Sequence, residues 1–264
     1  MAPNPPPPPA ALLPQAQLTI PGDNSVARPD VKAVWGSSCL VKARGHTVLF
    51  DTGADPPCSR RNLAALRIDP SSIEAVVLSH YHGDHTFGAP GLGRRQGLRT
   101  YVPESLTHHP EEAAAMGAAG LEPETVSGPT TLFEGITITK PLPFTESDTP
   151  ELAAEQCLTL DTPAGLVVIV GCSHPGVVAQ LEQVKQQTDR PLYLVIGGFH
   201  QFDRPEAEAR EIATAMRSLG VQNVAATHCT GEAAAAVFRT VFGGHYIPAG
   251  VGAVIELPLP ATTP

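Results

Sequence analysis

The chain has 264 residues, 42% of them hydrophobic, and a formal net charge of -9, which suits one α/β domain with a substantial core. Because Lys and Arg form no basic cluster, nucleic acid is not an expected partner. The apolar run 166–170 is much shorter than the roughly 20 residues of a membrane-spanning helix, so no membrane partner is expected. Prolines 5–9 stand where a signal peptide has its hydrophobic core, which predicts a cytoplasmic protein.

The N-terminal segment differs in composition from the rest of the chain. Residues 1–17 are rich in Pro and Ala with almost no charge, which predicts a disordered arm. A single domain is expected over 18–258, because no linker-like stretch interrupts it, and 259–264 is expected to be a tail. The five cysteines are odd in number and lack CxxC spacing, which predicts free thiols.

The predicted elements change character along the chain. In the first half, β-branched runs bounded by Gly, Pro and Asp predict strands at 38–43, 47–50, 75–78, 100–102, 130–133 and 136–139, with a short helix at 60–66. The second half alternates predicted strands and helices, at 166–170, 177–187, 192–196, 205–219, 224–226 and about 232–240. This order predicts an α/β (α+β) fold in which two sheets face each other beneath outer helices, an αββα four-layer sandwich.

Four ligand-type side chains lie within six residues, directly after the strand predicted at 75–78. They are His80, His82, Asp84 and His85. His80 and His82 project to one side of an extended turn, while Asp84 and His85 follow as the chain enters a helix. Imidazole and carboxylate ligands suit Zn²⁺, and also Mn²⁺ or Fe²⁺, so the loop predicts a site for two divalent metal ions.

Three further histidines follow predicted strands in the second half: His174, His200 and His228. Strands of an α/β sheet deliver residues to a common crevice at their carboxyl ends, so these histidines can converge on the same site. His200 is open between a metal ligand, a substrate-contacting acid and a loop histidine, with substrate contact ranked first.

The His-x-His-x-Asp-His motif resembles the metallo-β-lactamase fold superfamily, and Asp51-Thr52-Gly53 resembles the motif that precedes it there. The resemblance implies an αββα sandwich in which Asp51 orients metal ligands from behind. It also implies two ligand sets, which are His80, His82 and His174 for one ion, and Asp84, His85 and His228 for the other.

The segments GCSHPG (171–176), GGFH (197–200) and HCTG (228–231) resemble one subgroup, the dihydropterin-type ribofuranosylaminobenzene-phosphate synthases and their relatives. Cys172 stands where the superfamily often has a bridging Asp, so it is a candidate bridging thiolate or a residue behind the ligands. Tyr81 and Gly83 exchange the residue types usual in the subgroup. Phe87 replaces an expected Gly, which would narrow the mouth of the pocket.

These residues predict a binuclear hydrolase that acts on an ester, phosphoester or lactam-like small molecule. Two ions would lower the pKa of water held between them from about 15.7 to roughly 7, and Asp84 would exchange protons. One alternative is a transferase that joins a dihydropterin alcohol to a phosphorylated aminobenzene riboside, with phosphate near Gly176 or Gly231. Another is a non-catalytic metal-binding protein. The oligomeric state stays open.

Overall fold

The computed structural model describes residues 12–145 and 153–260, which form two large β-sheets and six α-helices within these ranges. The first sheet has the order β15-β1-β2-β3-β4-β5-β6. Its strands are β1 (Ala16–Gly22), β2 (Ser38–Ala43), β3 (His46–Phe50), β4 (Ala75–Val77), β5 (Leu98–Pro103), β6 (Leu121–Val126) and β15 (Val254–Leu257). The helices over it are α1 (Pro56–Ala65), the short α2 (Gly83–Thr86) and α3 (Pro110–Ala119).

The second sheet has the order β14-β13-β12-β11-β8-β7. Its strands are β7 (Thr130–Phe133), β8 (Ile136–Ile138), β11 (Leu158–Thr162), β12 (Gly165–Ile169), β13 (Leu192–Gly198) and β14 (Asn223–Thr227). Its helices are α4 (Val177–Gln187), α5 (Glu206–Ser218) and α6 (Glu232–Phe242), and a small hairpin pairs β9 (Leu142–Pro143) with β10 (Ala154–Glu155).

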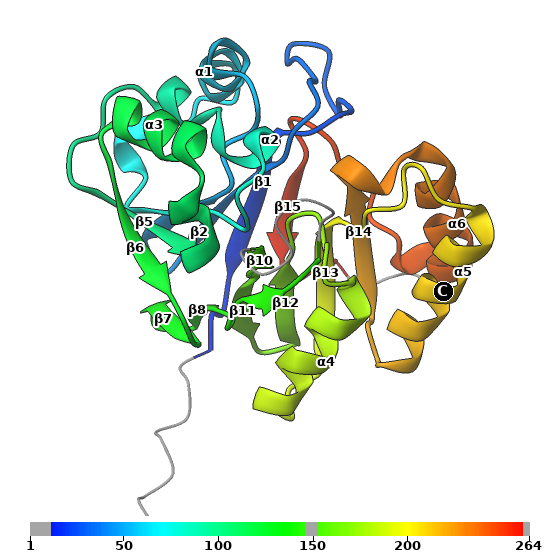
Figure 1. Ribbon diagram of the computed structural model, residues 1–264. Helices are drawn as coiled ribbons and strands as arrows, with labels where there is room; N and C mark the ends of the chain where they lie inside the picture. Colours follow the sequence, from blue (N-terminus) through cyan, green and yellow to red (C-terminus); the bar gives the residue numbers. More distant parts are fainter. Residues whose placement is uncertain (1–11, 146–152, 261–264) are drawn as a thin grey trace, which may run out of the picture.

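The layers follow from the distribution of buried apolar side chains. One cluster joins the facing sheets and includes Phe50 of β3 and Ile169 of β12. A second packs α4, α5 and α6 on the outer face of the second sheet, with Phe238 at its centre, and a third lies under α1 and α3. Figure 1 shows the two helical layers on opposite sides of the sheets. The predicted αββα sandwich is confirmed.

Parallel strands in both sheets direct their carboxyl ends to one edge of the sandwich. In the first sheet β3, β4 and β5 are parallel neighbours, and in the second β12, β13 and β14 are parallel neighbours. The segments that follow these strands carry the motif residues of the sequence. Chain topology therefore brings the two halves of the predicted site together.

Each strand and helix predicted from sequence coincides with an element of the structure. The predictions omitted β1, β6, β9, β10, β11, β15 and α3, of which β6 and β15 are the edge strands of the first sheet. β6 illustrates the reason, because LEPETV contains a proline and three polar residues and has an exposed middle. Such composition suits the edge of a sheet, where a strand needs neither two buried faces nor every ladder hydrogen bond.

The boundary expected for the N-terminal arm at residue 17 is wrong. β1 begins at Ala16, and Leu13 is already buried and donates its N–H to the Asp161 carbonyl oxygen at 2.7 Å. Residues 1–11 lie outside the described part of the chain. The expected tail likewise begins too early, since the Leu259 N–H donates to the Tyr193 hydroxyl at 2.9 Å; residues 261–264 are not described.

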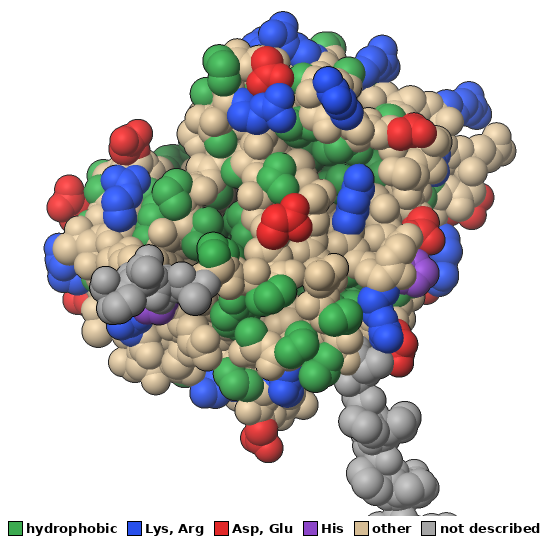
Figure 2. All heavy atoms as spheres, turned by 180° about the vertical axis from the view of Figure 1, so that it is seen from behind, with side chains coloured by type: hydrophobic (Ala, Val, Ile, Leu, Met, Phe, Trp, Pro, Cys, Tyr) green, Lys and Arg blue, Asp and Glu red, His purple; other side chains and the backbone are tan. Residues whose placement is uncertain are grey.

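The exterior carries charges of both signs. On the face shown in Figure 2, Lys and Arg side chains are interspersed with Asp and Glu and do not gather into one patch.

None of the helices in the described ranges has the length and apolar composition needed to cross a membrane.

Gly88 allows the chain after α2 to pack closely on the loop that follows β3. A Cβ atom at Gly88 would lie 1.9 Å from the Thr52 carbonyl oxygen, whereas one at Gly117 in α3 would meet nothing within 4 Å. We predict that Gly88→Ala lowers the free energy of unfolding by about 1–3 kcal/mol. The matched Gly117→Ala should raise it by up to about 1 kcal/mol, because alanine favours helix. Urea denaturation measures both, and equal effects would contradict this packing.

Candidate metal centre

The carboxylate of Asp51 lies fully buried behind the site and accepts three short hydrogen bonds. Asp51 follows β3 with a positive φ of 58°, which turns its side chain toward the segment after β4. Oδ1 accepts the Ser79 N–H at 2.7 Å, and Oδ2 accepts the Ser79 hydroxyl at 2.8 Å. Oδ2 also accepts His85 Nδ1–H at 2.6 Å. A carboxylate with these contacts can orient His85 directly and His80 through Ser79.

These bonds determine which nitrogen of His80 faces the site. Ser79 Oγ gives its only proton to Asp51, so it must accept from His80 Nδ1, which lies 2.8 Å away. His80 Nε2 then carries a lone pair, and it lies 3.1 Å from His82 Nδ1. Burial, followed by the nearby histidines, lowers the pKa of His80 well below its usual value, so the ring stays neutral.

The first predicted ligand set forms a compact triangle of imidazole rings. The ring centroids of His80 and His82 are 4.7 Å apart, those of His82 and His174 are 4.6 Å apart, and those of His80 and His174 are 4.8 Å apart. Burial and the charges of neighbouring histidines lower the pKa of His174 to about 2. Neutral imidazoles at this spacing suit a divalent cation.

The second predicted set also comes together. Asp84 Oδ2 lies 3.1 Å from His228 Nε2 and 3.8 Å from His85 Nε2. Burial opposes ionisation of Asp84, but the adjacent His228 side chain and the charge of His85 hold its pKa below the usual value. Burial acts to lower the pKa of His85, yet Asp51 raises it to about 9, so a metal bound at Nε2 would displace a proton.

Cys172 is common to both sets. Its Sγ lies 3.1 Å from His85 Nε2, and it belongs to one group with Asp84, His85 and His228 and to another with His80 and His174. Within each group the ligand atoms all lie within 4.8 Å of one another. The thiol is fully buried. Cys172 is therefore a candidate ligand in either group.

The donor set fits two divalent ions of the zinc type. It combines imidazole nitrogens, a carboxylate and a thiol, which are the ligand types that zinc prefers. His228 Nε2 is buried and makes no hydrogen bond, although it faces the Asp84 carboxylate. A buried polar atom of this kind is costly to leave unpaired, and a metal ion would satisfy it.

Two acidic residues that the sequence analysis missed hold the later histidines in place. The buried Glu155 carboxylate accepts the N–H groups of Ser173 and His174 at 2.8 and 2.7 Å, and burial raises its pKa to about 7. Asp23 accepts the His228 N–H at 2.7 Å. Glu155 and Asp23 lie outside the recognised motifs, and only contacts between distant segments reveal them.

The sequence analysis also missed Asn24, which orients the ring of His228. Asn24 Oδ1 lies 3.1 Å from His228 Nδ1 and is the acceptor of that contact, so Nε2 is free to face Asp84. An Asp-Asn pair at a turn is a common pattern, and no local signal in the sequence marked it as part of the site.

Several residues of the centre have backbone conformations that non-glycine residues rarely adopt. Ser173, His200 and His228 have φ of 63°, 48° and 46°. Each follows one of the parallel strands β12, β13 and β14, and each turn aims a side chain into the edge of the sandwich. Such conformations persist where the surrounding structure fixes them, and they concentrate at functional sites.

His200 lies at the margin of this cluster. Its ring centroid is 4.5 Å from that of His174, and it forms a third group of potential ligands with Cys172 and Cys229. The Cys229 side chain raises the pKa of His200, and Nδ1 of this ring is buried without a hydrogen bond.

All five cysteines are free thiols in the structure, in agreement with the sequence prediction.

The exchange of residue types at Tyr81 and Gly83 has a structural counterpart. A Cβ atom at Gly83 would lie 2.3 Å from the ring of Phe87, so Phe87 occupies the space that a side chain at 83 would need. Tyr81 stacks on His109 with centroids 3.7 Å apart. The departures from the subgroup pattern at 83 and 87 are therefore linked by packing, whereas Tyr81 contacts a different residue.

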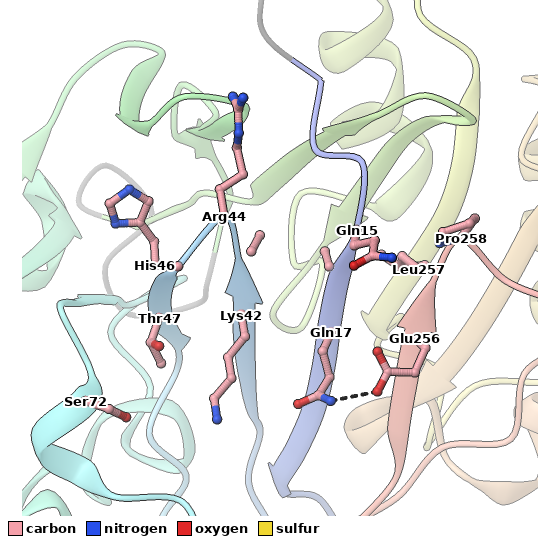
Figure 3. A pocket seen from close by; sticks show the side chains of 13 residues that line it. Gln15, Gln17, Lys42, Arg44, His46, Thr47, Ser72, Glu256, Leu257 and Pro258 are labelled. Carbon is pink, nitrogen blue, oxygen red and sulfur yellow. Dashed lines mark hydrogen bonds between the residues drawn. The ribbon is translucent and has the colours of Figure 1, made fainter.

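A separate cavity of about 640 Å³ lies away from the candidate ligands. Figure 3 shows it over β1, β2, β3 and β15, where Gln17 Nε2 donates to Glu256 Oε1 at 2.7 Å. None of the candidate ligands lines it. The cation of Arg44 at its margin pairs with Glu134 at 2.7 Å. The candidate ligands thus lie at the edge of the sandwich and not in this hollow.

The fold and this cluster point to a known class of protein. Residues 34–183, more than half of the chain, match the Metallo-beta-lactamase superfamily, and the chain belongs to it. The resemblance drawn from the His-x-His-x-Asp-His motif is confirmed. Among solved structures, Tm1679, described as a metal-dependent hydrolase of the beta-lactamase superfamily, has a TM-score of 0.76 and 26% identity over 92% of this chain and 99% of its own.

Two curated relatives add detail. The chain is 27% identical to the 7,8-dihydropterin-6-methyl-4-(beta-D-ribofuranosyl)-aminobenzene-5'-phosphate synthase of Methanocaldococcus jannaschii, over 84% of this chain and 89% of that enzyme. It is 29% identical to a ribonuclease Z of Methanosarcina mazei over 44% of this chain, which is 40% of that enzyme. The predicted likeness to the synthase subgroup agrees with the first relative.

Asp51→Asn tests the orienting role of the buried carboxylate. The amide nitrogen would face Ser79 Oγ and His85 Nδ1, which are both donors, so His85 would have to move its proton to Nε2. We predict that zinc affinity falls by roughly 10–100-fold while the fold persists. Competition with a chromophoric chelator measures the affinity.

The matched control is Asp161→Asn, the same chemical change at a carboxylate that pairs with Arg190 at 3.0 Å. Zinc affinity should not change in this variant. Equal zinc affinities in both variants and the parent protein would contradict an orienting role for Asp51.

Proposed function

We propose that the chain is a binuclear metal-dependent hydrolase that acts on a small molecule with an ester, phosphoester or lactam-like bond. Two sets of side chains would hold the ions: His80, His82 and His174, and Asp84, His85 and His228. Zinc is the first choice for this donor set, with manganese or iron as alternatives. The observation that carries the proposal is Cys172, whose Sγ belongs to both ligand groups.

The two ions would lower the pKa of a water between them to about 7 and stabilise negative charge that develops on the substrate. Asp84 is suited to proton transfer, because its side chain is 21% exposed while its Oδ2 stays beside His228 and His85. His200 would donate a hydrogen bond to the substrate from the margin of the centre. Asp51, Glu155 and Asn24 would keep the ligands in place.

Elemental analysis of the purified protein, paired with hydrolysis assays on the same sample, tests the proposal. The panel should contain phosphodiester, phosphomonoester, lactone and β-lactam substrates. Near two ions per chain and turnover of one substrate would support the hydrolase. Protein that takes up neither zinc, manganese nor iron would overturn it.

A second candidate is a transferase that uses the same centre. The observation in its favour is the synthase of Methanocaldococcus jannaschii, which matches this chain over 84% of its length. Two ions per chain without hydrolysis, together with condensation of a pterin alcohol and an aminobenzene riboside phosphate, would favour this reaction.

His82→Ala and Asp84→Ala each remove one ligand without emptying the core, since both side chains are partly exposed. We predict that kcat/KM falls by at least about 10³-fold in each variant while the melting temperature stays near that of the parent. His245→Ala is the matched control, because that ring contacts Asn223 Oδ1 and none of the candidate ligands. Full activity in His82→Ala or Asp84→Ala would contradict the assignment.

Cobalt substitution tests Cys172 independently of turnover. A thiolate bound to Co²⁺ gives a charge-transfer band in the near ultraviolet, and we predict that the loaded protein shows this band and that Cys172→Ser loses it. Cys58→Ser should retain it, because the Cys58 thiol contacts the Lys32 carbonyl oxygen away from the centre. A band that survives Cys172→Ser would exclude this sulfur as a ligand.

A further inference from the structure

Two exposed aromatic side chains lie beside the metal centre. In the described part of the chain five large hydrophobic side chains are exposed, and two of these, Trp35 at 49% and Phe202 at 48%, touch each other. Their ring centroids are 5.1 Å apart at 75°. Trp35 also lies 5.2 Å from the His228 ring, and Phe202 lies 5.5 Å from the His200 ring. Apolar surface exposed at such a position marks a binding surface.

The loop that carries Trp35 is attached to the residues around the second ion site. The Gly36 N–H donates to Asn24 Oδ1 at 3.0 Å, and this oxygen also contacts His228 Nδ1. A Cβ atom at Gly36 would lie 2.8 Å from the Asp84 carbonyl oxygen, so the backbone packs directly on a ligand residue. The position of the indole ring is therefore tied to that of the ligands.

Phe202 is fixed in a similar way. Its N–H donates to the carbonyl oxygen of Cys229 at 3.1 Å, and Cys229 directly follows His228 in the chain. Gly231 has φ of 75°, and a Cβ atom there would lie 2.7 Å from Phe202 Cα. The backbone of Phe202 therefore packs on the turn that presents His228.

The geometry of the two rings indicates what this surface binds. Two rings that meet near a right angle form a corner in which a flat ring can stack on one face and meet the edge of the other.

We propose that Trp35 and Phe202 form a subsite for a planar aromatic ring of the substrate, next to the ion held by Asp84, His85 and His228. The inference rests on the proposed function, since it places a substrate at that ion, and it adds the chemical class of the group bound there. Trp35 and Phe202 are specificity-determining residues in this account.

The test compares two acids of equal charge and similar size, benzoate and cyclohexanecarboxylate, on the zinc-loaded protein. Both can reach a metal ion through the carboxylate, but only benzoate presents a flat aromatic ring. Calorimetry should give a Kd for benzoate roughly 2- to 10-fold lower. Trp35 is the only tryptophan of the chain, so the tryptophan fluorescence of the protein reports on this ring. This fluorescence should change when benzoate binds.

Variants separate stacking from a loss of structure. Trp35→Ala and Phe202→Ala should bring the ratio of the two Kd values close to one, and Trp35→Phe should keep most of the preference. Val254→Ala is the matched control, because Val254 is 50% exposed on β15 outside the centre. Equal Kd values in the parent protein, or an undiminished preference in Trp35→Ala, would overturn the proposal.

Two further outcomes are informative. If the panel shows no hydrolysis but benzoate is still preferred through Trp35, the subsite stands and the hydrolase fails. If Trp35→Ala changes the sedimentation coefficient and the parent protein binds both acids equally, the aromatic pair is an interface between copies of the chain, which overturns the subsite.

Discussion

Asp51 accepts three hydrogen bonds, two from Ser79 and one from His85. The rest of the centre depends on this arrangement. Because a buried carboxylate can only accept, the Ser79 proton and the His85 Nδ1 proton both point toward it. The remaining nitrogens, His80 Nε2 and His85 Nε2, then face the interior of the site. One buried charge thus sets the orientation and protonation of two ligands that belong to different ions.

The second sheet supplies the partners of these ligands through the ends of its parallel strands. The strained turns at Ser173 and His228 direct side chains to the same edge of the sandwich. The carboxylates of Glu155 and Asp23 accept hydrogen bonds from the backbone N–H groups of these two residues. Cys172 Sγ belongs to both groups of potential ligands, and we propose that this sulfur bridges the two ions. The centre is therefore built from two rigid halves that meet only in the folded chain.

The sequence predicted the fold class and the residues that carry local signals. The His80 to His85 motif could be read because its ligands are close in sequence and follow a buried strand, and His174 and His228 could be placed because parallel strands share an edge. Glu155, Asp23 and Asn24 could not be predicted, because their partners lie 18 to 205 residues away. The aromatic corner of Trp35 and Phe202 was missed for the same reason, and β6 and α3 have compositions that give no clear periodic signal.

Anomalous X-ray diffraction at the zinc edge, from crystals of the zinc-loaded protein, tests the central claim most directly. We predict two peaks about 3.5–4 Å apart, one among His80, His82 and His174 and one among Asp84, His85 and His228. Cys172 Sγ should lie about 2.3 Å from at least one of them. A single peak, or zinc bound away from these residues, would contradict a binuclear centre at the edge of the sandwich.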